Sequence, residues 1–391
     1  MVLTGLDIIA SNVPASLKSK RVAVLCHAPS ITGGYRHIAD VLADAGCRVV
    51  ALFGPQHGLH GETQDNMIEW EGGTDQSRSL PVYSLYGAHR KPTAEMLKDT
   101  EILLIDLQDV GARLYTYIWT VKLCMEAAAE KGIPVLILDR PNPASVMPVD
   151  GALLHRSFFT FVGGAEIPLC HRLTIGELAL WLREYELPGC DLNVVAMEGW
   201  NRNAPFRESK VAWVPPSPNM PTPESTLPYP GTVLAEATNV SEGRGTTTPF
   251  ELIGAPWMDA HGIISNLGGR NLKGCAFRNH NYIPVFHKYE GELCQGIFIH
   301  VTNPRIYKPV ETALHIFDAI VSGDGGENFR FLDPPYEYEE RLMPFDILAG
   351  DEGMREVLSG RRSIEAEVER WREGEALFMK KAEPLLLYPW R

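Results

Sequence analysis

The chain has 391 residues, of which 45% are hydrophobic and 22% charged, values typical of a soluble globular protein. A chain of this length exceeds one ordinary hydrophobic core, so we expect two domains. The net charge of −13 argues against a nucleic-acid partner, because phosphate binding needs a basic surface, and against a polybasic membrane anchor.

Localisation is predicted from three further features. No apolar run approaches the roughly 18 residues that a transmembrane helix requires. The N-terminal sequence MVLTGLDIIASNVPASLKSKR lacks a basic segment followed by an apolar one, so we expect no signal peptide. The seven cysteines show no C-x-x-C spacing and fit reduced thiols. We therefore expect a cytoplasmic protein with no membrane association.

The first 140 residues alternate short apolar runs with segments of helical periodicity. The predicted strands are 21–26, 48–53, 101–107 and 133–138, with 80–86 as a short strand or an extended loop. The predicted helices are 35–45, 93–98 and 118–131, and Gly46 and Gly132 are placed to end the first and the last. This alternation predicts an α/β fold built on a Rossmann-like, doubly wound parallel sheet.

The second half of the chain is less regular. We predict helices at 174–185, 310–320 and 362–380, and strands at 192–197 and 296–301. The proline-dense passage 214–230 excludes regular helix and central strand, so it is either a linker or a rigid loop that forms part of a site. We place the domain boundary at its end, which gives a Rossmann-like domain of 1–230 and a smaller α+β domain of 231–391.

Polar side chains follow the predicted strands, at the edge where open α/β sheets bind ligands. The run ILLI at 102–105 passes directly into Asp106, Gln108, Asp109, Arg113, Tyr115 and Tyr117. The loops after the other strands add His27, Gln56, His57, His60, Glu62, Asp65, Asp139, Arg140 and Asn142. Hydroxyl-rich ligands such as sugars need this mixture of amides, carboxylates and arginines. A structural role for several of these residues, as helix caps or turn ties, stays open.

Cofactor signals are absent or weak. The sequence has no phosphate-binding P-loop, no H-E-x-x-H zinc helix and no G-x-S-x-G elbow, and Gly243-Arg-Gly245 lacks the third glycine of a dinucleotide fingerprint. His57, His60 and Glu62 are residue types that bind zinc, but their spacing is not helical. We expect neither a nucleotide cofactor nor a metal.

A second polar segment, 239–251, carries Asn239, Glu242, Arg244 and Thr246. It has too few apolar residues to form core, so it is exposed, a cap or part of a site. Trp213 and Trp257 either offer a stacking face for a sugar ring or pack as half-buried side chains.

These segments resemble a known family. The strings FGPQHG, LPVYSLYG, RKPTAEML, IDLQDVGARLYTYI, LDRPNP, HRLTIGELA, PSPNMPT, YPG and NVSEGRGTTTPFELIGAPW match, in order, the DUF1343 or YbbC-like family of NamZ-type exo-β-N-acetylmuramidases. The match runs from about residue 5 to the C-terminus. The resemblance implies a Rossmann-like domain, an auxiliary C-terminal domain and a substrate cleft between them. It also implies release of N-acetylmuramic acid from the non-reducing ends of peptidoglycan fragments.

The resemblance adds substrate-binding candidates. His171 and Asn219 lie within the matching strings. The lactyl carboxylate of muramic acid needs a cation, for which Arg113, Arg140 and Arg244 are candidates.

The sequence departs from the family at three positions. Gln56 stands where the family commonly has a glutamate proposed as catalytic, Arg172 where glycine is usual and His60 where arginine is common. Glutamine can neither donate nor accept the proton that glycosidic cleavage requires. Three interpretations follow: another carboxyl does the acid work, the substrate is a different glycoside, or the protein binds a sugar without cleaving it.

We predict a glycoside hydrolase that acts on a saccharide or muropeptide without metal or cofactor. Glu62 or Asp65 is expected to face Glu242 or Asp109 across the cleft. The alternative is a non-catalytic saccharide-binding or sensing protein. The sequence does not determine the oligomeric state.

Overall fold

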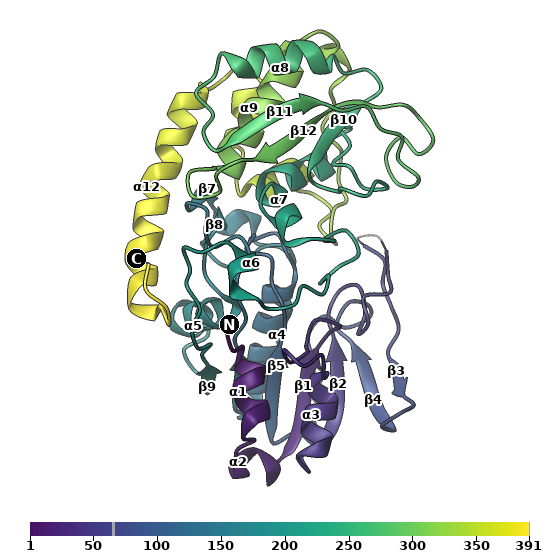
Figure 1. Cartoon of the computed structure of the whole chain (residues 1–391), viewed down its shortest axis with the longest axis vertical. Helices are drawn as coiled ribbons and strands as arrows, with labels where there is room; N and C mark the ends of the chain where they lie inside the picture. Colours follow the sequence, from purple (N-terminus) through teal and green to yellow (C-terminus); the bar gives the residue numbers. More distant parts are fainter. Residues whose placement is uncertain (65–66, 391) are drawn as a thin grey trace.

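The computed structural model describes residues 1–64 and 67–390. A seven-stranded sheet forms the lower part of the molecule in Figure 1. Its strands are β1 (Arg21–Cys26), β2 (Arg48–Gly54), β3 (Gly73–Asp75), β4 (Leu80–Ser84), β5 (Ile102–Asp106), β6 (Val135–Leu138) and β9 (Leu192–Val195). The strand order is β3-β4-β2-β1-β5-β6-β9, and every neighbouring pair is parallel except β3 with β4. The predicted α/β fold with a mostly parallel sheet is confirmed.

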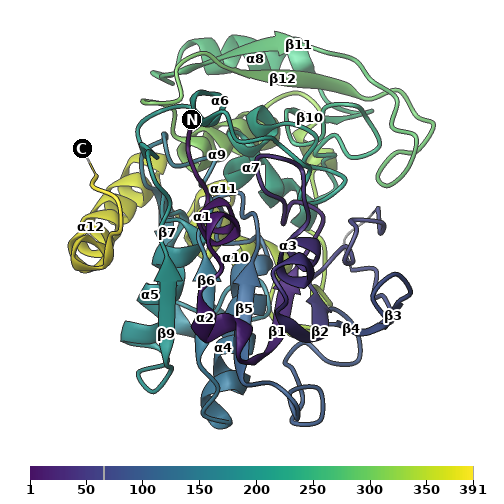
Figure 2. The same cartoon turned by 60° about the horizontal axis from the view of Figure 1, so that its bottom comes forward.

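Helices cover both faces of this sheet, because alternate side chains of its buried strands point to opposite sides. Val22 and Val24 of β1 pack in one apolar cluster, and Ala23 and Leu25 pack in another. The first cluster lies under α1 (Gly5–Ser11), α2 (Ala15–Lys18) and α3 (Ile38–Asp44). The second lies against α4 (Tyr117–Glu130) and α5 (Ile175–Tyr185), on the opposite face (Figure 2).

The upper part of the molecule is built on a smaller antiparallel sheet, β10-β12-β11 (Figure 1). Its strands are β10 (Leu252–Ala255), β11 (Cys275–Asn279) and β12 (Gln295–Val301). Helix α8 (Ala260–Gly268) packs on β11, β12 and α9 (Pro309–Ser322). A smaller antiparallel sheet in the C-terminal part agrees with the predicted α+β character.

Short elements connect the two parts. A two-stranded ribbon consists of β7 (Asp150–Leu153) and β8 (Pro168–Cys170). The remaining α-helices are α6 (Phe206–Ser209), α7 (Tyr229–Thr232), α10 (Pro344–Ala349), α11 (Gly353–Leu358) and α12 (Ile364–Ala382). Single 3-10 turns lie at Arg156–Phe158, Pro223–Thr226, Val233–Ala237, Gly326–Asn328 and Glu383–Leu385.

The C-terminal segment returns to the first half of the chain. Helix α12 runs along one side of the molecule and packs on β7, β8 and α9 (Figure 1). The segment after it, which we call the C-terminal tail (residues 386–390), reaches the large sheet, where the Tyr388 hydroxyl donates to Asp139 at 2.8 Å. One hydrophobic cluster contains residues of both parts. The division at residue 230 stays a prediction.

Most of the predicted elements are present, and one is not. Residues 93–98 were expected to form a helix and form turns instead. The Leu97 amide donates to Thr93 four residues back, whereas those of Lys98 and Thr100 donate three residues back, so no helical ladder develops. Among the described residues, no helix combines the length and apolar character needed to cross a bilayer.

Candidate active site

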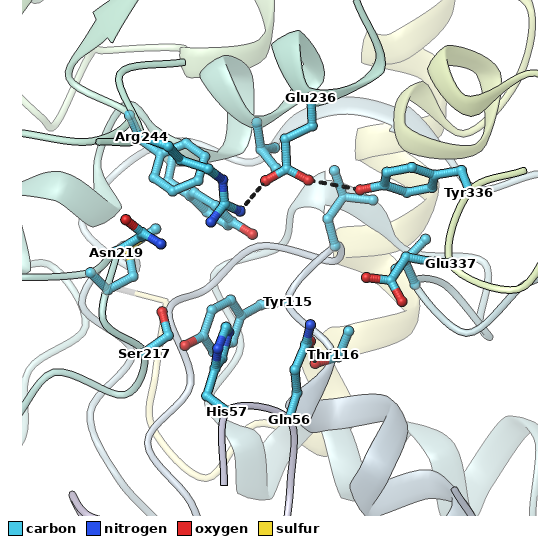
Figure 3. A pocket seen from close by; sticks show the side chains of 16 residues that line it. Gln56, His57, Tyr115, Thr116, Ser217, Asn219, Glu236, Arg244, Tyr336 and Glu337 are labelled. Carbon is cyan, nitrogen blue, oxygen red and sulfur yellow. Dashed lines mark hydrogen bonds and ion pairs between the residues drawn. The ribbon is translucent and has the colours of Figure 1, made fainter. Parts of the chain in front are cut away.

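A hollow lies between the carboxyl edge of the large sheet and the C-terminal part of the chain (Figure 3). Its cavity volume is about 40 Å³, room for a few water molecules. We call it the central pocket; it is lined by Gln56, His57, Leu114, Tyr115, Thr116, Val162, Ser217, Asn219, Met220, Tyr229, Val233, Glu236, Arg244, Phe250, Tyr336 and Glu337. Strand ends, the proline-dense passage and two later loops therefore converge on one space.

The floor of the pocket is the end of β2 and the start of α4. Gln56 follows β2, and its Oε1 accepts a hydrogen bond of 2.6 Å from the Thr116 hydroxyl. The Tyr117 hydroxyl, at the first residue of α4, lies 3.3 Å from the Gln56 carbonyl. His57 has a positive φ of 71°, and its Nδ1 donates to the Thr63 carbonyl at 2.9 Å. These bonds fix the Gln56 amide and the His57 ring at the pocket floor.

An aromatic wall closes one side. The rings of Tyr115 and Tyr229 lie 6.0 Å apart, and those of Tyr229 and Phe250 lie 4.7 Å apart, both edge to face. Burial raises the pKa of Tyr115 and Tyr229, so both phenols stay neutral. Neutral, rigid rings of this kind suit the apolar face of a sugar.

An ion pair lies opposite the floor. Arg244 approaches the Glu236 carboxylate at 2.5 Å, and the Tyr336 hydroxyl donates to the other Glu236 oxygen at 2.8 Å (Figure 3). The loop that carries Arg244 depends on Gly245, which has a φ of 78° and where an added Cβ would lie 2.4 Å from the Phe286 carbonyl oxygen. The polar segment 239–251, for which exposure, a cap and a site were left open, thus places a cation in the pocket.

A second buried carboxylate supports this ion pair. Glu242 accepts from Lys288 at 3.0 Å and lies 3.2 Å from Arg244 and 3.3 Å from the His287 ring. Burial would raise the pKa of the Glu242 carboxyl, but Lys288, His287 and Arg244 outweigh it and hold that pKa well below its usual range. Glu242 does not line the pocket, and it anchors Arg244 from behind.

Among the described residues, the other carboxyl that lines the pocket is Glu337. It is 4% exposed and accepts a hydrogen bond of 3.0 Å from the Tyr86 hydroxyl. Burial raises the pKa of Glu337 to about 7, the charge of Glu236 adds to the rise, and the Tyr86 bond opposes it. In Figure 3 the Glu337 carboxyl points toward the side of the pocket that Gln56 and Thr116 occupy.

The structure brings some predicted site residues together and separates others. Those that line the central pocket are Gln56, His57, Tyr115, Asn219 and Arg244. Tyr117 lies beside the pocket through its contact with Gln56. The other predicted substrate-binding side chains are not among its lining residues: Asp106, Gln108, Arg113, Asp139, Arg140, Asn142, His171, Asn239 and Thr246.

Several of these side chains form the scaffold of the carboxyl edge. Asp106 and Arg140 are a buried pair joined by bonds of 2.5 and 2.8 Å. Arg113 is fully buried and donates to the carbonyls of Ala152, Ile167 and Leu348 at 2.9–3.1 Å.

Others bind the backbone next to them. Gln108 donates to the carbonyls of Asp109 and Pro141, and Asn142 donates to the carbonyl of Leu173. Asn239 donates to the carbonyl of Asn328, and Thr246 donates to the carbonyl of Gly243. His171 accepts from the Leu173 amide.

The C-terminal tail covers the β6 side of the carboxyl edge. Asp139 accepts from Thr174 at 2.7 Å and from Tyr388 at 2.8 Å. Glu177 accepts from the amides of residues 387 and 388 and forms a buried ion pair of 2.6 Å with Arg202. The predicted sugar-binding edge is therefore divided, with the pocket on one side and the tail on the other.

The predicted catalytic carboxyls are dispersed. Glu62 is exposed and accepts from the His60 amide at 2.9 Å. Asp109 is buried, accepts from the Gly111 amide at 2.8 Å and has a pKa raised to about 7 by burial. Neither side chain lines the central pocket, and Asp65 lies outside the described residues. The predicted pairing across a cleft stays a prediction.

Sequence reasoning did not single out Glu236, Tyr336 or Glu337. Glu236 lies in a buried 3-10 turn at Val233–Ala237, and Glu337 lies in the acidic stretch YEYEE, which reads as a solvated loop. Glu337 differs from the neighbouring acidic residues because it is buried against Tyr86. This contact joins two residues that lie 251 positions apart in the sequence. Among the residues that the structure covers, no group of three His, Cys, Asp or Glu side chains is arranged to hold a metal ion.

Comparison with known proteins identifies the family. The N-terminal profile of exo-β-N-acetylmuramidase NamZ matches residues 22–224, and the C-terminal profile matches residues 227–388. The peptidoglycan β-N-acetylmuramidase NamZ of Bacillus subtilis (strain 168) is 40% identical over 389 residues, which cover 99% of this chain and 91% of that protein.

Two crystal structures of DUF1343 family proteins from Bacteroides fragilis NCTC 9343 are also similar. They are 32% and 30% identical, with TM-scores of 0.90 and 0.78, and in both comparisons 99% of each chain is covered. The fold, the two matched regions and the full-length identity show that this chain belongs to the NamZ (DUF1343) family.

Proposed function

We propose that this protein is an exo-acting glycosidase that hydrolyses peptidoglycan fragments and releases an N-acetylmuramic-acid-type sugar from their non-reducing end. The observation that carries this proposal is the pair of carboxyls in one small pocket, Glu236 and Glu337. Glycosidic cleavage generally uses two carboxyl groups. The matched family profiles, named for an exo-β-N-acetylmuramidase, support attack at a chain end.

The cation for the lactyl carboxylate is assigned by elimination. Arg113 is committed to three backbone carbonyls and Arg140 to Asp106. Arg244 lines the pocket and is held between two carboxylates, so a third carboxylate bound there would share its guanidinium. We therefore propose that Arg244 binds the carboxylate that distinguishes muramic acid from N-acetylglucosamine.

The relative from B. subtilis, named a peptidoglycan β-N-acetylmuramidase, supports the substrate class. A cytoplasmic location is part of the same proposal, and all seven cysteines are free thiols. A cytoplasmic enzyme would act on imported muropeptides during recycling rather than on the cell wall itself.

The test is release of sugar by the purified protein. It should cleave a chromogenic β-N-acetylmuramic acid glycoside and muropeptides, and it should cleave the matching β-N-acetylglucosamine glycoside far more slowly, because that sugar lacks the lactyl carboxylate. EDTA should change neither rate. If the sugar stabilises the protein thermally but no substrate releases sugar, the protein is not a glycosidase. That result would favour the alternative suggested by Gln56, a saccharide-binding protein without catalytic activity.

A further inference from the structure

The two carboxyls that the described part of the chain places in the central pocket, Glu236 and Glu337, have different partners. Glu236 forms an ion pair of 2.5 Å with Arg244 and accepts a hydrogen bond of 2.8 Å from the Tyr336 hydroxyl. Glu337 accepts from the neutral Tyr86 hydroxyl, and no lysine, arginine or histidine of the described chain forms an ion pair with it. One carboxyl is therefore suited to carry charge and the other to carry a proton.

A tight turn holds Glu337 in this position. The amide of Tyr336 donates to the Glu339 carbonyl at 2.9 Å and the amide of Glu339 donates back at 2.9 Å, which closes the turn over Glu337 and Tyr338. Both of these residues have positive φ angles, 43° and 70°, in a region where asparagine and glycine are preferred. Such strain costs on the order of 1–3 kcal/mol per residue and gathers at functional sites.

The turn also fixes the direction of each side chain. Glu337 points into the pocket, whereas Tyr338 is 45% exposed. The guanidinium carbon of Arg90 lies 3.2 Å from the centroid of the Tyr338 ring. The Tyr338 hydroxyl donates to Glu69 at 3.0 Å. Contacts with Tyr86, Arg90 and Glu69 thus attach a C-terminal turn to the N-terminal part of the chain.

We propose that Glu337 is the general acid of this pocket, that it protonates the glycosidic oxygen, and that Tyr86 is its positioning residue. This inference rests on the glycosidase function proposed above. Gln56 faces the same space, but its amide has no proton to transfer. Glu337 is a buried pocket carboxyl whose hydrogen-bond partner, the Tyr86 phenol, is neutral.

The reaction balances with these groups. The C1–O bond breaks with its electron pair on the glycosidic oxygen, which takes the proton from Glu337, and the shortened fragment leaves as an alcohol. A water oxygen bonds to C1, and its released proton passes to the Glu236 carboxylate. Proton exchange with solvent then restores both carboxyls. A pKa near 7 leaves Glu337 protonated in about half of the molecules at neutral pH.

The experiment is Glu337→Gln, assayed on two muramic acid glycosides that differ only in the leaving group. A sugar leaving group needs protonation, so we expect kcat to fall by about 10²–10⁴-fold. A dinitrophenyl leaving group departs without a proton, so the loss there should stay below about tenfold. The control is Glu340→Gln, which changes an exposed side chain three residues after Glu337. It should leave both rates at the wild-type values.

Folding is checked separately, by the thermal midpoint and by calorimetric binding of N-acetylmuramic acid. The glutamine amide oxygen can still accept from Tyr86, so the variant should fold and bind. Equal activity of variant and wild type on both substrates, or equal losses on both, would overturn the assignment of Glu337 as the acid. A wild-type protein that cleaves neither substrate would instead refute the proposed glycosidase function.

Discussion

The hydroxyl of Tyr86 donates a hydrogen bond of 3.0 Å to the carboxyl of Glu337, and the two residues lie 251 positions apart in the chain. This bond stabilises the ionised carboxylate more than the neutral acid, so it lowers the pKa of Glu337 against the rise that burial causes. The bond therefore sets the pH range in which a proton can be delivered.

Tyr86→Phe should move the pH–rate profile. Loss of the hydrogen bond raises the pKa of Glu337, so Glu337 keeps its proton to higher pH and the alkaline limb of kcat should shift upward. Tyr83→Phe, on strand β4 three residues before Tyr86 and outside the pocket, is the matched control. An unchanged alkaline limb in Tyr86→Phe would show that the phenol does not position the titrating acid.

Gln56→Glu tests whether the family's usual residue is needed for turnover. A second carboxylate facing Glu337 should raise the pKa of Glu337 through like-charge repulsion, so the alkaline limb should again shift upward. If Glu337 is the acid, kcat at its optimum should change by less than about tenfold, well below the contribution of a general acid. A larger gain in kcat would mean that the wild-type protein lacks its acid and would favour the binding function.

Asp109 should make the fold less stable as pH rises. Burial raises the pKa of Asp109 to about 7 in the folded state, whereas an unfolded aspartate titrates near about 3.9. Between these values the folded state binds the extra proton, so the free energy of unfolding falls with increasing pH.

Asp109→Asn removes this titration. Relative to wild type, its stability should increase by up to about 1.4 kcal/mol per pH unit between pH 4 and 7. Urea unfolding at several pH values measures the difference, and the exposed Asp99→Asn serves as control. Parallel curves for Asp109→Asn and wild type would contradict a buried, protonated Asp109.

Tyr388 should contribute to stability rather than to catalysis. Its hydroxyl donates to Asp139 at 2.8 Å and accepts from the Met197 amide at 2.6 Å, both buried. Tyr388→Phe removes one of the hydrogen bonds to Asp139 and leaves the buried Met197 amide without its acceptor, which should cost about 1–3 kcal/mol in urea unfolding. Tyr185→Phe removes an exposed hydroxyl that bonds to Lys381 and should cost much less. Equal costs would mean that the tail contact is not stabilising.

The large sheet could be predicted because its buried strands are marked by apolar runs that are local in the sequence. The run ILLI at 102–105 is apolar because β5 is buried on both faces, and the same holds for β1 and β6. Strand β11 was missed because its five residues, CAFRN, alternate between exposed and half-buried positions and form no apolar run.

The site was only partly predictable because its contacts are non-local. Gln56 and Tyr115 were found from their place after a strand, but Asp139 occupies an equivalent place and is covered by Tyr388, 249 residues later. The proline-dense passage was read as either a linker or a site-forming loop, and its Ser217, Asn219 and Met220 line the pocket. No local sequence pattern predicts which strand end the C-terminal tail covers.

The returning tail also constrains when the protein can mature. Asp139, Glu177 and Arg202 form hydrogen bonds with residues 387 and 388, which are translated long after them. Until then these buried charges lack the hydrogen bonds that the C-terminal tail supplies, and this edge of the large sheet stays incomplete. A stop codon at position 387 would therefore damage a part of the protein that was translated much earlier.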